Sequence, residues 1–197
     1  MAYHPNYFEG GPGHRSSCAD RLQCLRNHAV GRTMFDVGCS EGYNAFGMAE
    51  TFDHILAVDN VERNVRGCVE LAAQHNVGNI TWVDGDFRAH LVGDAYWDCV
   101  MYLSVHHHIC GQISIEQASK VLRELSERGE MMLFDMGQKN EEGVTENTWW
   151  KALPSVDGDQ EEWLRTYVLE NTRYERAELI GSFPIHNIQR LLWKLEM

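Results

Sequence analysis

Glycines and a carboxylate mark the end of an early apolar run, in a pattern that could bind a ligand. The run Met34-Phe35-Asp36-Val37 leads into Gly38-Cys39-Ser40-Glu41-Gly42, and a helix is expected from Asn44. A buried strand that turns through glycines into a helix brings backbone N–H groups to one point. Gly38 and Gly42 would give the turn its dihedral angles and a ligand its close approach. Such turns also serve simple strand-to-helix connections, so this motif alone is weak evidence.

A second carboxylate, Asp59, supports the ligand-site interpretation. It ends the apolar run 55–58, one strand–helix–strand unit after Asp36, and Asn60 follows it. An acidic side chain at this place can accept hydrogen bonds from both hydroxyls of a ribose. A phosphate-binding loop would need Gly-Lys-Ser/Thr, which is absent. The dinucleotide fingerprint would need a second glycine where Ser40 stands.

Two further apolar runs also end in polar or small residues. The run 80–83 is followed by Asp84, Gly85, Asp86 and Phe87. The run 97–103 carries Asp98, ends in Leu103 and is followed by Ser104. Strand patterns that alternate with helical ones are typical of a parallel α/β sheet. Such sheets bind their ligands at the carboxyl ends of the strands, so the site is expected there.

In this order, the glycine turn and the acidic residues of the second, third and fourth strands resemble the class I S-adenosylmethionine-dependent methyltransferases. The resemblance covers roughly residues 33–135, with Ser40 in place of the family's central glycine and Glu41 in place of a small residue. It implies an α/β, Rossmann-like fold with a seven-stranded, mostly parallel sheet, an antiparallel last strand and helices on both faces. It also implies S-adenosylmethionine as cofactor and S-adenosylhomocysteine as product.

The resemblance assigns roles to these residues. The turn from Gly38 to Gly42 would pass under the ribose and methionyl part of the cofactor, and Asp36 would orient the turn or the ammonium group. Asp59 would bind the ribose, and Asp86 the adenine amino group, with a plain turn aspartate as the alternative. The expected cofactor-binding residues are Arg15 (or a solvated surface arginine), Asp36, Gly38, Gly42, Asp59, Asn60, Gly85, Asp86, Phe87, Leu103 and Ser104.

Three consecutive histidines, His106 to His108, follow the fourth run. Neighbouring side chains of an extended segment point to opposite faces, so these three cannot converge on one ion, and no metal site is expected. His107 or His108 is expected to line the acceptor pocket as a catalytic residue, and at least one of the three to be structural. For a hydroxyl acceptor His107 would be the general base. For a phosphate acceptor the candidate donors are Arg15, His107, Lys139 and Lys151.

Three segments, 103–109, 134–139 and 174–195, are similar to the methyltransferase domain of bacterial O-antigen chain-terminating methyltransferase/kinases. This similarity implies methyl transfer to an oxygen of a small or glycan-linked acceptor, with a phosphate as one candidate. No kinase domain or long coiled coil is found in the 197 residues. The alternatives are an RNA-directed methyltransferase of the 5′-phosphate type and a catalytically silent module that binds S-adenosylmethionine.

Composition fits a globular protein with a sizeable core. The chain has 197 residues, 44% of them hydrophobic, and a net charge of −12. This acidity argues against a broad nucleic-acid surface, though not against a local basic cleft. Six cysteines without Cys-x-x-Cys spacing indicate reduced thiols in a cytoplasmic protein. We expect no membrane span and no secretory signal. The acceptor and the oligomeric state stay open.

One methyltransferase domain is expected over residues 1–197. Its parts are an N-terminal segment with a covering helix (1–32), a cofactor-binding core (33–136), a loop or lid (137–162) and a C-terminal helix and strand pair (163–197). The expected strands are 33–37, 54–59, 80–84, 98–103, 130–136, 177–183 and 189–195. One helix is expected to begin near Ser17, and four further helices are expected over 44–52, 62–75, 114–128 and 160–169. Val65, Val69 and Ala72 would face the core from the helix 62–75.

Overall fold

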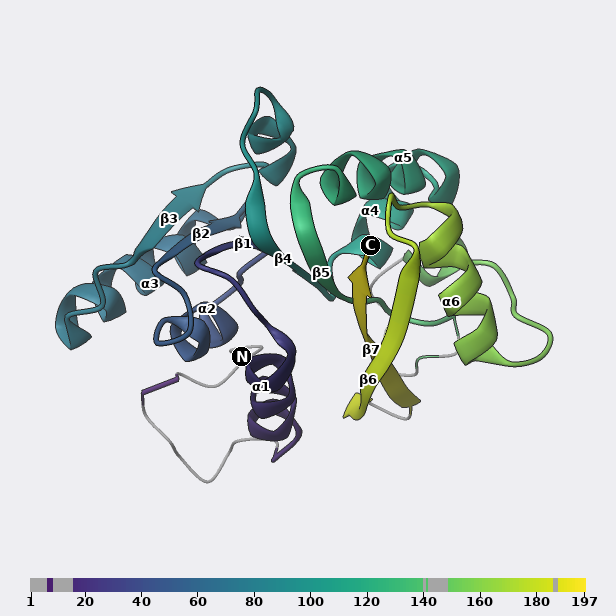
Figure 1. Cartoon of the computed structure of the whole chain (residues 1–197), viewed down its shortest axis with the longest axis horizontal. Coiled ribbons are helices and arrows are strands. Elements are labelled where there is room, and N and C mark those ends of the chain that lie inside the picture. Colours follow the sequence, from purple (N-terminus) through teal and green to yellow (C-terminus); the bar gives the residue numbers. More distant parts are fainter. Residues whose placement is uncertain (1–6, 9–15, 140, 142–148, 186–187) are drawn as a thin grey trace. The chain divides into compact units, whose positions relative to one another are not determined.

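The computed structural model of the chain describes residues 7–8, 16–139, 141, 149–185 and 188–197 (Figure 1). The residues gather into two compact units, 1–101 and 102–197, and strand β4 (Trp97–Leu103) runs from the first into the second. The single domain expected over the whole chain stays a prediction. Arg15 and the side chain of Ser17, the expected helix cap, lie outside the described residues.

The first unit is built on parallel strands joined by helices. Its elements are α1 (Ser16–His28), β1 (Thr33–Val37), α2 (Tyr43–Met48), β2 (His54–Asp59), α3 (Glu62–His75), β3 (Ile80–Asp84) and the 3₁₀ helix η1 (Phe87–Leu91). Strand β2 lies between β1 and β3, with Val58 level with Val37 and Asp59 level with Asp84. The carboxyl ends of these three strands therefore meet at one edge, which is where the sequence predicts the cofactor.

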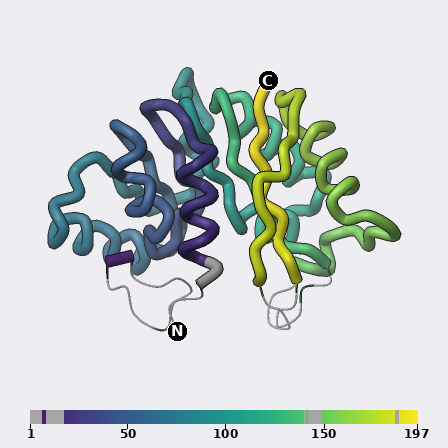
Figure 2. Tube along the Cα trace, turned by 60° about the horizontal axis from the view of Figure 1, so that its bottom comes forward, coloured from purple at the N-terminus to yellow at the C-terminus, as the bar shows by residue number. Residues whose placement is uncertain are grey.

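The second unit combines helices with antiparallel strands. Its elements are α4 (His106–Ile113), α5 (Ile115–Ser126), β5 (Gly129–Asp135), η2 (Trp149–Lys151), α6 (Gln160–Glu170), β6 (Arg176–Ile185) and β7 (Ile188–Glu196). Strand β7 is antiparallel to both β5 and β6, and Figure 2 shows β6 and β7 side by side in yellow. The strand order is β3-β2-β1-β4-β5-β7-β6. The expected seven-stranded sheet with an antiparallel last strand is thus confirmed.

Two expectations for helices of the first unit are wrong. The buried residues of α3 are Val65, Cys68 and Ala72. Val69 is 48% exposed, because it lies about 100° around the helix from Cys68, beyond the buried stripe. Helix α2 ends at Met48 and not at Phe52. The side-chain amide of Asn79 donates to the carbonyls of Ala49 (2.7 Å) and Phe52 (2.8 Å), which stabilises a turn there.

Helix α5 follows the expected pattern more closely. Ala118, Leu122 and Leu125 are fully buried at helical spacing. The Ser114 hydroxyl caps the helix by accepting the backbone N–H of Gln117 (3.4 Å). Within the described ranges, no helix of the chain has the length and apolar character that a membrane span would need.

The segment after β4 is a helix, and the extended conformation expected for the three histidines is wrong. Ser104 adopts a left-handed conformation (φ 61°) that turns the chain out of β4, and α4 begins at His106. His106, Ile109 and Cys110 are buried together at i, i+3 and i+4, which is the spacing of one helix face. Consecutive side chains therefore diverge by about 100° rather than alternating.

Candidate active site

The glycine turn after β1 has the left-handed backbone that its sequence predicts. Gly38 (φ 73°), Ser40 (φ 51°) and Gly42 (φ 76°) all have positive φ. Ser40 therefore keeps the conformation of the glycine it replaces, at a cost of about 1 kcal/mol. A Cβ on Gly42 would lie 2.8 Å from Cys68 Sγ and 2.9 Å from the ring of Trp82. Packing against α3 and β3 thus requires glycine at position 42, independently of any ligand.

Asp59 ties this turn to the end of β2. Its Oδ2 accepts the backbone N–H of Ser40 (2.8 Å), and its Oδ1 accepts that of Val61 (2.9 Å). Each carboxylate oxygen has a second acceptor direction, so Asp59 can hold the turn and still bind the hydroxyls of a ligand. The next residue, Asn60, is exposed, and the Gly85 N–H donates to the Asp59 carbonyl (2.9 Å).

Asp36 is a buried carboxylate beside the same turn. It is 4% exposed, and its Oδ2 has no hydrogen-bond partner among the described residues. Burial, together with the nearby charge of Asp59, raises the pKa of Asp36 to about 8, against an opposing effect of Arg21. Leaving a buried acceptor unpaired costs free energy, so this oxygen fits a donor or cationic group of a ligand.

Asp86 caps η1 at the end of β3. Its carboxylate accepts the backbone N–H of Arg88 (2.9 Å) and forms an ion pair with the Arg88 guanidinium. These contacts lower its pKa. The structure thus gives Asp86 the role of a turn aspartate, and an adenine amino group would share the carboxylate with Arg88. Phe87 beside it is buried.

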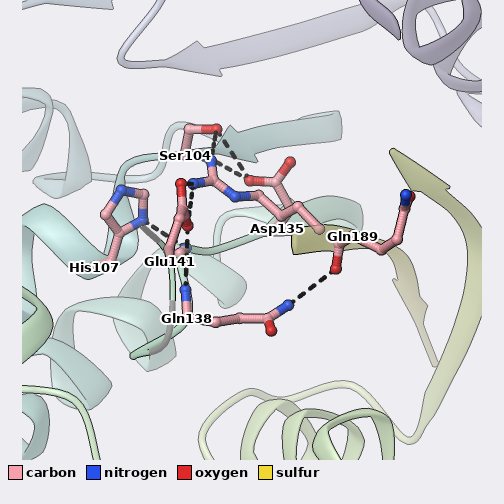
Figure 3. Close-up of polar contacts among 8 residues, drawn as sticks. Ser104, His107, Asp135, Gln138, Glu141 and Gln189 are labelled. Carbon is pink, nitrogen blue, oxygen red and sulfur yellow. Dashed lines mark hydrogen bonds and ion pairs between the residues drawn. The ribbon is translucent and has the colours of Figure 1, made fainter. Parts of the chain in front are cut away.

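In the second unit, a polar cluster joins the ends of β4 and β5 to the beginning of β7 (Figure 3). The Asp135 Oδ1 accepts the Ser104 backbone N–H (2.8 Å) and hydroxyl (3.2 Å). The Ser104 hydroxyl in turn accepts Nη1 of Arg190 (2.8 Å). Nη2 of Arg190 contacts both oxygens of Glu141 (2.5 and 2.7 Å), and both side chains are only 2% exposed. Leu103, immediately before Ser104, is buried.

Neither Arg190 nor Glu141 is among the residues that the sequence predicts for the site. A weak signal exists for Arg190, because it alternates with the apolar Leu192 on the inward face of β7. Glu141 lies in an irregular, polar segment where no periodicity distinguishes it. The two side chains are 49 residues apart in the chain, so their pairing becomes visible only in the fold.

His107 is buried and held as a hydrogen-bond donor. Its Nδ1 accepts the backbone N–H of Gly137 (2.8 Å), which leaves the ring proton on Nε2. Its ring packs on Trp149, with 4.4 Å between centroids. Burial, with smaller effects of His108 and Arg190, holds its pKa well below the usual value. The ring is therefore neutral and a poor general base, but its Nε2–H can donate.

His106 is structural. Ser119 donates to the carbonyl of Ile115 (2.8 Å) and so must accept from the Tyr167 hydroxyl (2.8 Å). Tyr167 then accepts from His106 Nε2 (2.7 Å), and His106 Nδ1 lies 3.4 Å from the Tyr102 hydroxyl. Burial lowers the pKa of His106 to about 3, so the ring is neutral. The expectation that one of the histidines is structural fits this network.

The remaining candidates have mixed placements. His108 is exposed beside His107. Lys139 donates to the carbonyl of Leu153 (3.0 Å), and the Lys151 ammonium lies 5.6 Å from the ring centre of Trp150. Arg15 is outside the described residues. In the part of the chain that the structure describes, no group of three His, Cys, Asp or Glu residues is placed to hold a metal.

Sequence comparison matches this chain to methyltransferases. Residues 34–129 match the family model described as "Methyltransferase domain". The O-antigen chain terminator bifunctional methyltransferase/kinase WbdD of Escherichia coli is 25% identical over 184 residues, which make up 86% of this chain. Those residues are 23% of WbdD, so the chain spans about a quarter of that relative's length.

Structural comparison confirms the fold. A crystal structure of WbdD covers 100% of this chain and 44% of its own, with a TM-score of 0.78 and 18% identity. Magnesium protoporphyrin IX methyltransferase (ChlM) from Synechocystis PCC 6803, solved with bound SAH, covers 94% of this chain and 84% of its own, with a TM-score of 0.64 and 17% identity. The glycine turn, the strand order and the domain match lead to one conclusion. Residues 34–129 carry a methyltransferase domain, and the chain has the fold of the class I S-adenosylmethionine-dependent methyltransferases.

Proposed function

We propose that this methyltransferase acts on an oxygen of a small or glycan-linked acceptor, and that this oxygen belongs to a phosphate. The observation that carries the proposal is the state of His107, which accepts an amide N–H at Nδ1 and has a depressed pKa. A neutral hydroxyl acceptor would need a general base, and His107 is the wrong tautomer for one. A phosphate oxygen is already anionic at neutral pH and needs hydrogen-bond donors instead.

The first unit fits S-adenosylmethionine. The Oδ2 of Asp36, which no described residue contacts by a hydrogen bond, suits a donor or cationic group. Asp59 has acceptor directions left for the ribose hydroxyls. The turn from Gly38 to Gly42 would lie against the ribose and methionyl part. When bound, this cofactor supplies a sulfonium methyl group that an aligned oxygen can displace, so positioning contributes most of the rate. The other proposed contacts are Arg15, Asn60, Gly85, Asp86, Phe87, Leu103 and Ser104.

The relatives and the charge support the choice of acceptor. WbdD is named as an O-antigen chain terminator, which favours a glycan-linked acceptor for a chain similar to its methyltransferase part. The net charge of −12 disfavours an extended RNA surface. A phosphate on a small molecule or a glycan is compatible with both.

The cofactor assignment is tested by replacing Asp59 with Ala. The change removes an acceptor of two ribose hydrogen bonds, each worth about 1.5–3 kcal/mol, so affinity for S-adenosylmethionine should fall at least about tenfold. Calorimetric titration measures it. Asp84→Ala is the matched control, because Asp84 is exposed and lies level with Asp59 on the neighbouring strand. Unchanged affinity in a folded Asp59→Ala protein would refute the ribose role.

The acceptor assignment is tested with methyl-labelled S-adenosylmethionine and matched sugars. A sugar phosphomonoester and the same sugar without phosphate are incubated with the protein, and products are analysed by mass spectrometry and ³¹P NMR. Label should appear only on the phosphomonoester, as a methyl phosphate ester. Label on the unphosphorylated sugar, or on a carbon-bound hydroxyl of the phosphorylated one, would show that the acceptor is a hydroxyl.

A further inference from the structure

We propose that Arg190, held in place by the Ser104 hydroxyl, forms the subsite for the acceptor's anionic group, and that the carboxylate of Glu141 occupies this subsite until the acceptor replaces it. The inference rests on the proposed function and extends it, since it names the residues that would bind the phosphate. Neither residue of the ion pair belongs to the set that the sequence predicts.

The observed carboxylate shows that the cluster is built to hold an anion. Glu141 receives Nη2 of Arg190 on both oxygens, at 2.5 and 2.7 Å, and the backbone N–H of Gln138 on Oε2 at 3.4 Å. Nη1 of the same guanidinium contacts the Ser104 hydroxyl at 2.8 Å. Guanidinium groups bind phosphate and carboxylate with the same forked geometry, so a phosphate can take the place of this carboxylate.

The carboxylates beside Arg190 indicate replacement rather than addition. Glu141 contacts the guanidinium directly, and Asp135 is linked to it through Ser104. A further anion placed beside both carboxylates would be repelled, so an incoming phosphate should replace Glu141 rather than bind next to it.

The position of Glu141 makes its departure feasible. Glu141 belongs to no helix or strand, and its backbone N–H donates to the carbonyl of Gln138, three residues earlier (3.2 Å). Gln138 also donates from its side chain to the Gln189 carbonyl (3.2 Å), as Figure 3 shows. Ser104 and Gln138 are half-buried, so the cluster lies close to solvent although Arg190 is 3% exposed.

A purely structural ion pair makes the opposite prediction. In that case Arg190 and Glu141 only fasten the segment after β5 to β7. Neutralising Glu141 would then leave a buried, uncompensated cation and lower stability, and the KM of a phosphomonoester acceptor would not fall. In the displacement mechanism the same change removes an anion that competes with the acceptor, so the KM of the phosphomonoester should fall as well as the dissociation constant of free phosphate.

The experiment uses the full chain and inorganic phosphate as the probe, at constant ionic strength. Calorimetry measures phosphate affinity for the wild type, Glu141→Gln, and the double variant Glu141→Gln/Arg190→Gln. We expect affinity to rise at least about tenfold in Glu141→Gln and to be lost in the double variant. Glu161→Gln, a change of the same charge at a half-exposed position on α6, should match the wild type. The double variant removes both buried charges together, which folds tolerate better than removal of one.

A conservative variant covers the case in which Glu141→Gln does not fold. Glu141→Asp keeps the charge but shortens the side chain, so it should compete less well and give an intermediate affinity. Phosphate affinity that is equal in the wild type, Glu141→Asp and the double variant would overturn the subsite.

The two proposals fail separately. If S-adenosylmethionine binds and an unphosphorylated sugar is methylated, the phosphate acceptor fails even when Arg190 binds free phosphate. If a phosphomonoester is methylated with a KM that Glu141→Gln leaves unchanged, the proposed function stands and the subsite is wrong. In support of both, Glu141→Gln should lower the KM of the phosphomonoester about tenfold, with a smaller effect on kcat.

Discussion

At the scale of single residues, the chemistry of this protein depends on which polar atoms are already engaged. Asp36 and Asp59 lie beside the same turn. One oxygen of Asp36 has no hydrogen-bond partner in the part of the chain that the structure describes, whereas Asp59 holds two backbone N–H groups. His106 and His107 are neighbours, yet the first is enclosed in a hydroxyl network and the second is a neutral donor. Residue type alone does not separate these roles, because hydrogen-bond partners and burial decide them.

Asp36 should make stability depend on pH. Its pKa is raised to about 8 in the folded protein, whereas the unfolded chain has a value of about 3.9. Between these values the folded protein binds the extra proton, so stability falls as pH rises from about 4 to about 8. The Asp36→Asn variant lacks this titration, so its free energy of unfolding should rise by at least about 1 kcal/mol relative to that of the wild type when pH is raised over this range. Urea unfolding at both pH values measures the gain, and equal differences at the two would contradict the assignment.

His107 should act without titrating. Its pKa is well below the usual value, so kcat/KM on a phosphomonoester should not change with this group between about pH 6 and pH 8. His107→Asn keeps an acceptor for the Gly137 N–H and a donor amide. The factor by which it raises KM should be about ten times the factor by which it lowers kcat. A loss of about 10²–10⁴ in kcat, with a rate that rises with pH, would instead identify His107 as a general base. If neither parameter changes, this histidine belongs to the fold.

At the scale of elements, the regular strands were predictable, whereas the helix after β4 and the end of α2 were not. The bounds of β1, β2, β3 and α3 match the expected ranges, because long apolar runs with clear stops define them. The helix at His106 was missed because three histidines carry little propensity and no cap. Its signal was the spacing of His106, Ile109 and Cys110, which a prediction based on an extended segment overlooks. Asn79 stabilises the turn after α2 by donating to the carbonyl of Phe52, which is 27 residues earlier in the chain, so no local sequence pattern predicts this contact.

The hydroxyl network should hold α4, α5 and α6 together. Tyr167→Phe removes the group between His106 and Ser119 and leaves buried polar atoms unsatisfied, which should cost about 1–3 kcal/mol. Denaturant unfolding measures the loss. In a double-mutant cycle with Ser119→Ala, the combined loss should be smaller than the sum of the two single losses, because both changes break one bond. Strictly additive losses would show that the two hydroxyls do not interact.

At the scale of the whole molecule, the sequence predicted the fold better than the site. The seven-stranded, mostly parallel sheet and its antiparallel last strand follow from the family resemblance, and the structure and the comparisons agree. The Arg190–Glu141 pair was not predictable, since it joins a strand to an irregular segment far away in the chain. All six cysteines lie in described residues, and none of them forms a disulfide there.

The thiols should be protected by the fold. Burial is the main cause that raises the pKa of Cys68 and Cys110 to about 12, and Cys39 and Cys99 are also buried. Because the thiolate is the reactive form, a thiol reagent at neutral pH should modify these four only slowly in the native protein. Under denaturing, non-reducing conditions all six should react. A lower count there would reveal a disulfide, and rapid native modification of the buried four would reveal opening of the fold.

The interior position of β7 affects the order in which the sheet can form. β7 follows β6 in the chain but lies between β5 and β6 in the sheet. Neither β5 nor β6 can form the hydrogen bonds on its β7-facing edge until β7 is in place. Until then β5 presents an open edge, the type of surface that promotes aggregation in partly folded chains. Because Arg190 is on β7, its contacts with Ser104 and Glu141 assemble with this late insertion. Anion binding at this cluster would thus be confined to chains whose sheet is complete.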